Sequence, residues 1–380
     1  MTDRPQFTPL AESLPATVPF VGPEAQERTR GRMFRARIGA NENGFGPSPR
    51  VVAAMGAAAG EMWKYCDPEN HELRAALAAR LGVGPDNVVV GEGIDGLLNL
   101  AVRLFVTDGT PVVTSLGAYP TFNFHVAGFG GRLVAVPYSH DREDLDGLLA
   151  AVRRENAPLV YLSNPDNPMG SWWTAAEVER FAAALPAATM LVLDEAYGET
   201  APAGTMPAID VTRPNVLRMR TFSKAYGLAG LRCGYAVGAA EIIRAFEKIR
   251  THYGVNRMAQ AAGLAALADQ AYLSDAIGRI AAARDRIAAI ARANGLVPLP
   301  SATNFVAIDC GRDGAFALRA MEALIARDVF VRKPMAPGLD RCIRISAGPD
   351  AELDILAAAL PDALAAARDG ATDQPRASRP

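Results

Sequence analysis

The residue whose surroundings most suggest chemistry is Lys224. It is the one lysine of the segment 221–235 (TFSKAYGLAGLRCGY), where the hydroxyl residues Thr221 and Ser223 precede it and Arg232 follows it. A lysine in a partly desolvated pocket has a lowered pKa, and its neutral amine can attack an aldehyde. Lys224 is therefore a candidate nucleophile, and the alternative is an ordinary lysine in a surface loop.

Two carboxylates, Asp194 and Glu195, follow the apolar residues of the segment 191–197 (LVLDEAY). The pattern predicts a buried strand, and ligands of open α/β sheets bind at the carboxyl ends of the strands. A carboxylate buried there needs a cationic partner, because otherwise it takes up a proton. Asp194 is thus a candidate partner of a cationic ligand, or else the N-cap of a following helix.

Two further segments follow predicted strands. The segment 162–170 (LSNPDNPMG) has two Asn-Pro steps and a final glycine, which impose a rigid turn that carries amide side chains. The segment 91–96 (GEGIDG) precedes a helix that begins near Leu97, and backbone N–H groups at a helix N-terminus bind phosphate. Taken alone, each segment also fits a plain turn between a strand and a helix.

A sheet is needed to bring these segments together. Short apolar runs alternate with amphipathic stretches, and we expect strands over 88–90, 111–114, 133–137, 159–162, 190–193 and 216–220. This alternation predicts an α/β fold with a mostly parallel sheet flanked by helices. Apolar residues at helical spacing predict a long helix over 270–293. A smaller α+β domain is predicted after it, from strands over 304–309, 329–332 and 342–346 and helices over 316–325 and 351–366.

The chain is accordingly expected to have five parts. An irregular, proline-rich N-terminal arm spans 1–35, and the N-terminal part of the small domain spans 36–60. A large domain with the segments above spans 61–268. The small C-terminal domain spans 269–368, and a polar, disordered tail spans 369–380.

The composition argues against several classes of protein. The 380 residues are 50% hydrophobic, which allows a large core, and the net charge of −2 does not favour a nucleic-acid or membrane-binding surface. The four cysteines form no CxxC pair and the four histidines no HxxxH pair, so we expect neither a disulfide scaffold nor a metal site. We find no signal peptide or membrane-spanning segment and predict a cytoplasmic protein.

The motifs, taken in chain order, form a specific set. A glycine-rich turn is followed by NPxNPxG, then by DEAY, then by SKxxGLxGxR, and this order resembles the fold-type I aminotransferases of class I/II, which depend on pyridoxal 5′-phosphate (PLP). The resemblance spans roughly 37–366. Within the family the chain is most similar to the histidinol-phosphate aminotransferase branch, on the segments 39–49 (GANENGFGPSP), 65–68 (YCDP), 120–122 (PTF), 331–332 (VR) and 343–346 (IRIS).

The resemblance implies a role for each residue near the cofactor ring. Lys224 would bind PLP covalently and move a proton, while Asp194 would keep the pyridine nitrogen protonated. Asn167 and Tyr197 would hydrogen-bond the phenolic oxygen, and Phe122 would stack on the ring.

The resemblance also implies a phosphate site, a partner subunit and a substrate site. The cofactor phosphate would be held by Gly93, Ile94, Asp95, Thr221, Ser223 and Arg232. Tyr65 would reach it from the partner subunit, which implies a homodimer with shared active sites. Arg344, assisted by Asn167, would bind the substrate carboxylate, and Arg332 would meet the substrate phosphate.

The expected reaction is transfer of an amino group from a histidinol phosphate-like donor to a 2-oxo acid such as 2-oxoglutarate. Two alternatives stay open on the same scaffold, namely an aromatic amino acid aminotransferase and a PLP-dependent decarboxylase or lyase. A non-catalytic regulator would carry a basic DNA-binding module, and a Rossmann dehydrogenase would carry GxGxxG; the sequence shows neither.

Overall fold

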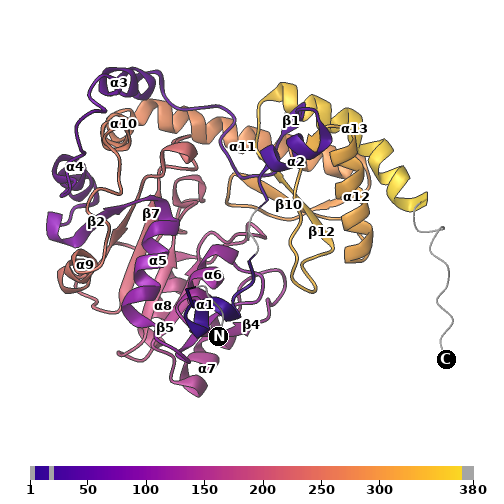
Figure 1. The fold of residues 1–380 in the computed structure, drawn as a ribbon. Helices are drawn as coiled ribbons and strands as arrows, with labels where there is room; N and C mark the ends of the chain where they lie inside the picture. Colours follow the sequence, from indigo (N-terminus) through magenta and orange to yellow (C-terminus); the bar gives the residue numbers. More distant parts are fainter. Residues whose placement is uncertain (1–4, 17–20, 370–380) are drawn as a thin grey trace.

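The structure is a computed structural model that describes residues 5–16 and 21–369 (Figure 1). Its largest sheet has seven strands in the order β2-β8-β7-β6-β5-β3-β4. In chain order these strands are β2 Val88–Gly91, β3 Pro111–Ser115, β4 Arg132–Val136, β5 Leu159–Ser163, β6 Met190–Asp194, β7 Val216–Thr221 and β8 Gly234–Val237. Every neighbouring pair is parallel except the two pairs that β8 makes, so the predicted mostly parallel sheet is confirmed. The strand β8 was not predicted.

Helices cover both faces of this sheet because its strands are apolar on both sides. In β5, Leu159 and Tyr161 face the cluster that contains α5 and α6, while Val160 and Leu162 face the cluster of α7 and α8. Such continuous apolar strands are typical of buried parallel sheets. The helices of this part are α4 His71–Leu81, α5 Gly93–Phe105, α6 Pro120–Gly128, α7 Leu145–Glu155, α8 Ala175–Ala184, α9 Ala240–Glu247 and α10 Arg257–Ala268, with short 3₁₀ turns η1 Pro85–Asn87, η2 Gly198–Thr200 and η3 Ala229–Leu231.

A second, smaller module follows the long helix α11, Gln270–Ala293, whose bounds match the prediction. Its antiparallel sheet has the order β12-β10-β9, and a short parallel pair joins β1 to β11. The elements are β1 Ala36–Arg37, β9 Val297–Pro298, β10 Phe305–Asp309, α12 Gly314–Ala326, β11 Val329–Phe330, β12 Cys342–Ser346 and α13 Asp350–Asp369. Along α11, Leu273 packs in the cluster of the larger module, whereas Ile280 and Ile287 pack in the core of the smaller one. One helix therefore connects the two cores.

The N-terminal region differs from the expectation of an irregular arm. It contains α1 Pro9–Ser13 and α2 Pro23–Arg30, each with proline in its first turn. Backbone N–H groups of the first turn have no acceptor within the helix, so the N–H that proline lacks costs no hydrogen bond there. Helix α2 is fixed to the body of the protein, because the buried Glu27 accepts a hydrogen bond from the Phe34 amide and Arg30 pairs with Asp328. Two of the prolines taken as signs of irregular chain, Pro9 and Pro23, in fact begin helices.

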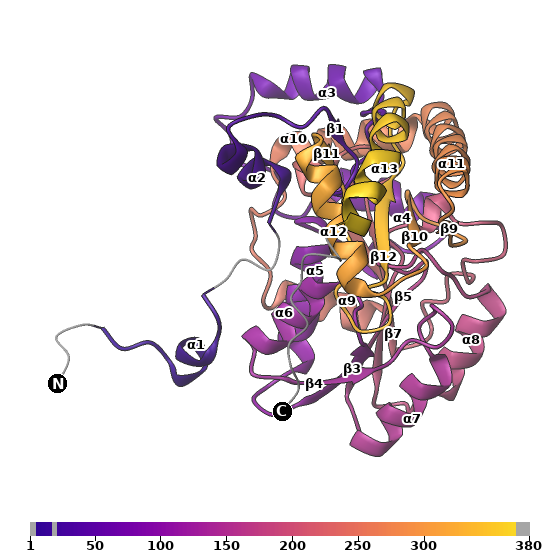
Figure 2. The same ribbon diagram turned by 90° about the vertical axis from the view of Figure 1, so that its right-hand side faces the viewer.

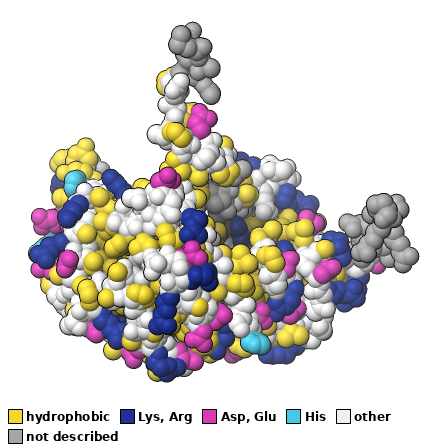
Figure 3. All heavy atoms as spheres, turned by 90° about the horizontal axis from the view of Figure 1, so that it is seen from below, with side chains coloured by type: hydrophobic (Ala, Val, Ile, Leu, Met, Phe, Trp, Pro, Cys, Tyr) yellow, Lys and Arg dark blue, Asp and Glu magenta, His cyan; other side chains and the backbone are white. Residues whose placement is uncertain are grey.

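The predicted small-domain range 36–60 divides between the two modules. Strand β1 pairs with β11 of the smaller module, but α3, Pro49–Ala59, packs beside α10, and its Val51 lies in a cluster with the large sheet (Figures 1 and 2). The predicted tail, 369–380, begins at Asp369, which is the last residue of α13, and the rest of it lies outside the described residues. Basic and acidic side chains are interspersed on the face shown in Figure 3. No helix of the described residues is long and apolar enough to cross a membrane.

The packing of α11 generates a stability prediction. Ile287 is completely buried in the smaller core, so Ile287→Ala should lower the free energy of unfolding by about 2–5 kcal/mol through lost burial and a residual cavity. Ile290→Ala, on the same helix but only partly buried, should cost less. Urea unfolding of both variants tests this, and equal losses would contradict the burial argument.

Candidate active site

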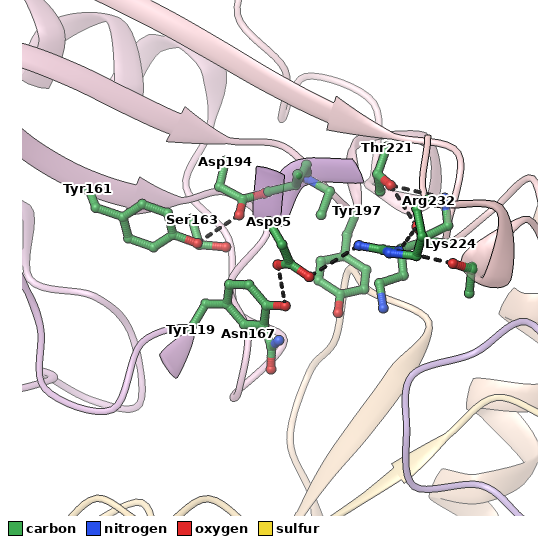
Figure 4. A pocket seen from close by; sticks show the side chains of 14 residues that line it. Asp95, Tyr119, Tyr161, Ser163, Asn167, Asp194, Tyr197, Thr221, Lys224 and Arg232 are labelled. Atoms are coloured by element: carbon green, nitrogen blue, oxygen red, sulfur yellow. Dashed lines mark hydrogen bonds and ion pairs between the residues drawn. The ribbon is translucent and has the colours of Figure 1, made fainter. Parts of the chain in front are cut away.

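The predicted site segments meet in one cavity at the carboxyl ends of β6 and β7. It encloses about 570 Å³, part of it open to solvent. Its lining comprises Ile94, Asp95, Tyr119, Tyr161, Ser163, Asn167, Asp194, Ala196, Tyr197, Thr221, Ser223, Lys224, Ala229 and Arg232 (Figure 4). The sheet topology explains this convergence, because β5, β6 and β7 are adjacent and parallel and so end at the same edge.

Lys224 follows β7 and extends into the cavity. Its Nζ donates a hydrogen bond to the Asn41 carbonyl oxygen at 3.1 Å and lies 5.6 Å from the centre of the Tyr197 ring. Burial and, second, the positive charge of Arg344 lower the pKa of Lys224 to about 8. About a tenth of the amine is therefore neutral at pH 7 and about half at pH 8, and neutral amine is the form that a nucleophilic or proton-accepting lysine requires.

Asp194 is the last residue of β6 and is buried. Its Oδ2 accepts a hydrogen bond from Tyr161 at 2.7 Å, and its Oδ1 accepts one from the Ala196 amide at 2.9 Å. Burial raises the pKa of Asp194 to about 6, although the two hydrogen bonds oppose the rise. No ion pair of Asp194 occurs among the described residues, so its carboxylate can still gain from a cation bound in the cavity. The bond to Ala196 shows that Asp194 also caps the following turn.

The neighbouring Glu195 differs sharply from Asp194. Its buried carboxylate is paired with Arg218 at 2.6 Å and Arg220 at 3.0 Å. These two cations compensate its charge within the protein. Of the two acids of the DEAY motif, only Asp194 lines the cavity.

An anion-binding corner lies at the start of α5. Gly93 has a φ of +73°, which favours glycine, and a Cβ there would lie 2.5 Å from the Arg232 guanidinium, so a larger residue would also displace that side chain. Arg232 pairs with Asp95 at 3.2 Å and donates to the Ser223 hydroxyl at 3.4 Å. The Thr221 hydroxyl lies 2.9 Å from that of Ser223. A helix N-terminus, two hydroxyls and an arginine thus converge as a phosphate group requires.

Three tyrosines, Tyr119, Tyr161 and Tyr197, line the cavity, whereas Phe122 does not. Phe122 is completely buried and stacks on Tyr161, with ring centres 4.5 Å apart, behind the cavity wall. Tyr119 lines the cavity and donates a hydrogen bond to Asp95 Oδ1 at 2.7 Å. The prediction for Phe122 therefore fails on its position. Helix α6 begins at Pro120, which leaves Tyr119 at the edge and turns Phe122 into the core.

The predicted substrate arginines lie in the smaller module. Arg344 on β12 is buried and donates to the Asn167 side-chain oxygen at 2.5 Å, which connects it to the cavity lining. Burial lowers the pKa of Arg344 to about 10, so it remains cationic at neutral pH. Arg332 does not line the cavity; it forms a backbone bridge with Arg344, and its guanidinium donates to the Val21 carbonyl of the N-terminal region.

Tyr65 lies outside the cavity of its own chain. Its side chain is 78% exposed and packs on Tyr253, with ring centres 4.8 Å apart. The exposed Met62 and Trp63 are close to it in sequence. These exposed apolar side chains form a surface suited to protein contact.

Two buried carboxylates behind the cavity were not predicted. Asp166 accepts hydrogen bonds from the Tyr138 hydroxyl at 2.7 Å and the Met169 amide at 2.9 Å, and Glu143 accepts one from the Ser163 amide at 3.1 Å. Burial raises the pKa of Asp166 to about 7; burial and the charge of Asp166 raise that of Glu143 well above its usual range. Asp166 lies within the NPxNPxG turn and could have been suspected, whereas nothing in the sequence marks Glu143.

The buried acids predict a pH dependence of folding stability. A carboxyl group whose pKa is raised by folding binds more protons in the folded chain, so its unfavourable burial grows as pH rises above the unfolded pKa. Glu143→Gln keeps an oxygen for the Ser163 amide but removes the charge. Without added ligand, the wild-type free energy of unfolding should fall between about pH 5 and 8, and the variant should lose about 1–3 kcal/mol less.

Urea unfolding at the two pH values measures this difference. The control is Glu179→Gln, which removes an exposed carboxylate on α8 and should retain the wild-type slope. A Glu143→Gln variant as pH-sensitive as the control would show that Glu143 is not a source of the dependence.

Comparisons with known proteins agree with this geometry. Residues 37–360 match the family model of the class I and II aminotransferases. The chain is 38% identical over 361 residues to a histidinol-phosphate aminotransferase of Anaeromyxobacter sp. (strain Fw109-5), covering 94% of this chain and 98% of the relative.

Solved structures show the same fold. The histidinol-phosphate aminotransferase of Sinorhizobium meliloti, solved in complex with pyridoxal 5′-phosphate, is 60% identical with a TM-score of 0.93 and covers 95% of this chain and 98% of that chain. The aspartate aminotransferase of Thermus thermophilus with maleate is 21% identical, with a TM-score of 0.80 over 95% of this chain and all of that one, and it supports the fold alone. The chain therefore belongs to the class I and II aminotransferases.

Proposed function

We propose that this protein is a PLP-dependent aminotransferase that takes an amino group from histidinol phosphate and passes it to a 2-oxo acid. The observation that carries the proposal is a lysine of lowered pKa in one cavity with a buried, cation-free Asp194 carboxylate and an anion-binding corner. The histidinol-phosphate aminotransferases similar to this chain, at 38% and 60% identity, support the choice of donor.

The residues of the cavity suit PLP at both ends. The Asp194 carboxylate, with no ion pair among the described residues, would lie beside a protonated ring nitrogen, while the start of α5 with Thr221, Ser223 and Arg232 would hold the phosphate. When bound, PLP supplies an aldehyde that condenses with amines and a cationic ring that accepts electrons from the substrate Cα.

The chain's own residues would then perform the proton transfers. Lys224 Nζ would take the proton from the substrate Cα as a general base and return it as a general acid, for which a pKa near 8 is suited. Tyr197 and Asn167 would hydrogen-bond the cofactor's phenolic oxygen. Tyr119, in place of Phe122, would pack against the ring.

The substrate would be bound mainly from the smaller module. Arg344, already held by Asn167, offers a buried guanidinium to a carboxylate or similar anion. Arg332 lies beside Arg344 and contacts Val21, so the N-terminal region would help to enclose a substrate phosphate there. The acceptor is proposed to be 2-oxoglutarate.

A homodimer and a cytoplasmic location are also proposed. Tyr65 does not reach its own cavity, yet it is highly exposed next to other exposed apolar side chains. In a homodimer it would be placed to meet the phosphate site of the partner subunit.

One prediction of the proposed function concerns Lys224. Lys224→Ala should lower kcat by about 10³-fold or more, because both the covalent attachment and the Cα proton transfer are lost. The control Lys248→Ala removes an exposed lysine after α9 and should leave kcat unchanged. Stopped-flow measurement of the donor half-reaction checks both, and normal turnover of Lys224→Ala would exclude the proposed role.

Another prediction of the proposed function concerns the amino-group donor. Arg332→Gln should lower kcat/KM for histidinol phosphate by about 10–100-fold, since a charge-assisted phosphate contact is lost, but should barely affect histidinol. Arg327→Gln, whose arginine donates to the Ala323 carbonyl, is the matched control.

Equal losses of Arg332→Gln on both donors would contradict the phosphate contact. Faster reaction with aromatic amino acids than with histidinol phosphate would replace the proposed donor. Release of CO₂ without amino transfer would indicate a decarboxylase.

A further inference from the structure

Asn41 is a buried residue of the loop after β1 for which the sequence suggested no role. It adopts a left-handed backbone conformation with a φ of 56°. Its side-chain nitrogen donates a hydrogen bond to the Tyr197 hydroxyl at 3.0 Å. Its carbonyl oxygen accepts bonds from Lys224 Nζ at 3.1 Å and from the Asn304 side chain at 2.9 Å. Asn41 thus contacts two groups of the cavity without lining it.

Ser346 on β12 determines which way the Asn41 amide points. The Ser346 hydroxyl oxygen accepts the Asn41 backbone N–H at 2.9 Å, so its single proton is available for the Asn41 Oδ1, at 3.3 Å. The oxygen of the amide therefore faces Ser346 and the NH₂ group faces Tyr197. With the amide reversed, two N–H groups would face the Ser346 hydroxyl and its proton would lose the Asn41 Oδ1 as an acceptor, which disfavours that orientation.

This orientation fixes the role of the Tyr197 hydroxyl. A phenol has one proton to donate. Since the Asn41 NH₂ group is itself the donor, the Tyr197 oxygen accepts on that side and keeps its proton for another acceptor. Tyr197 lines the cavity, so the acceptor within reach is a group bound there.

We propose that Asn41 is a positioning residue, which makes the Tyr197 hydroxyl a hydrogen-bond donor toward the cofactor's phenolic oxygen. The inference rests on the proposed function, because the acceptor is PLP. It deepens that function by assigning the direction of the Tyr197 bond to a residue outside the cavity lining.

The same contacts connect the cofactor site to the smaller module. Ser346 and Arg344 are two residues apart on β12, and side chains at this spacing lie on the same face of a strand. A substrate anion bound by Arg344 therefore acts on the strand that also orients Asn41. From this strand, Ser346 bonds to Asn41, and Asn41 bonds to Tyr197.

Asn41→Gly tests the side chain alone. Glycine adopts a positive φ without strain and retains the carbonyl that Lys224 and Asn304 use, so the backbone role of Asn41 is kept. Asn156→Gly is the matched control, because Asn156 has a φ of 50° in an exposed position after α7.

The readout is the pH midpoint of the visible absorption change of the PLP-loaded enzyme without substrate. A bond donated to the phenolic oxygen stabilises negative charge there and weakens its hold on a neighbouring proton, so losing the bond raises the midpoint. Tyr197→Phe should raise it by about 1 pH unit and Asn41→Gly by about 0.5. Adding Asn41→Gly to Tyr197→Phe should produce no further rise, and Asn156→Gly should produce none.

The outcomes separate the two proposals. Absence of a visible band in the PLP-treated wild type would overturn the proposed function and this inference with it. This inference alone would be overturned if Asn41→Gly left the pH midpoint of the band unchanged. It would also be overturned if Asn41→Gly shifted the midpoint equally in the wild type and in Tyr197→Phe.

A second variant covers the case in which Asn41→Gly retains no cofactor. In Asn41→Asp the group facing Tyr197 can only accept, so the phenol proton turns away from the cavity and the midpoint should rise at least as far as in Tyr197→Phe. An unchanged midpoint in Asn41→Asp would equally overturn the inference.

Discussion

The site depends on one electrostatic constraint, the burial of the Asp194 carboxylate without an ion-pair partner among the residues that the structure describes. Burial of this kind is costly and raises the pKa of the acid to about 6, yet two hydrogen bonds hold the carboxylate in a fixed direction toward the cavity. Glu195 shows the other solution, since Arg218 and Arg220, on one face of β7, compensate it fully. The adjacent acids thus differ in environment, because Asp194 at the end of β6 lines the cavity, whereas Glu195, directly after the strand, meets the arginines of β7.

The opposite shift at Lys224 follows from the same burial. Removing charge from water disfavours the ammonium just as it disfavours the carboxylate, and Arg344 adds repulsion. Compared with water, the protein thereby favours the protonated form of Asp194 and the neutral form of Lys224, next to the anion-binding corner at the start of α5. Burying these groups lowers the stability of the folded protein, and a ligand with complementary charges that binds the folded state raises that stability again.

The sequence was sufficient for the architecture and for the most chemically distinctive residues. Six of the seven strands of the large sheet, all but β8, and the whole of α11 were predicted because apolar periodicity reports burial directly. The sequence could not show that Tyr119 rather than Phe122 lines the cavity, since this depends on the residue at which α6 begins. The N-terminal helices were missed because proline in a first turn and proline in an irregular segment look alike in sequence. Asn41 depends on contacts with Tyr197 and Ser346, which are far away along the chain.

Residues to which the sequence assigned no role help to connect the two modules. Asn304 and Ser346 of the smaller module both bond to Asn41, which bonds in turn to Tyr197 and Lys224 of the larger module. The predicted Arg344 reaches Asn167 of the larger module. A cavity formed by one module alone would bind a cofactor but would have no means of responding to the substrate's anionic group. In the proposed roles, β12 supplies both the arginine for that group and the serine that orients Asn41, so a displacement of this strand would affect the substrate and Tyr197 alike. The position of the smaller module, maintained by α11 through both cores, is therefore part of the chemistry of the site.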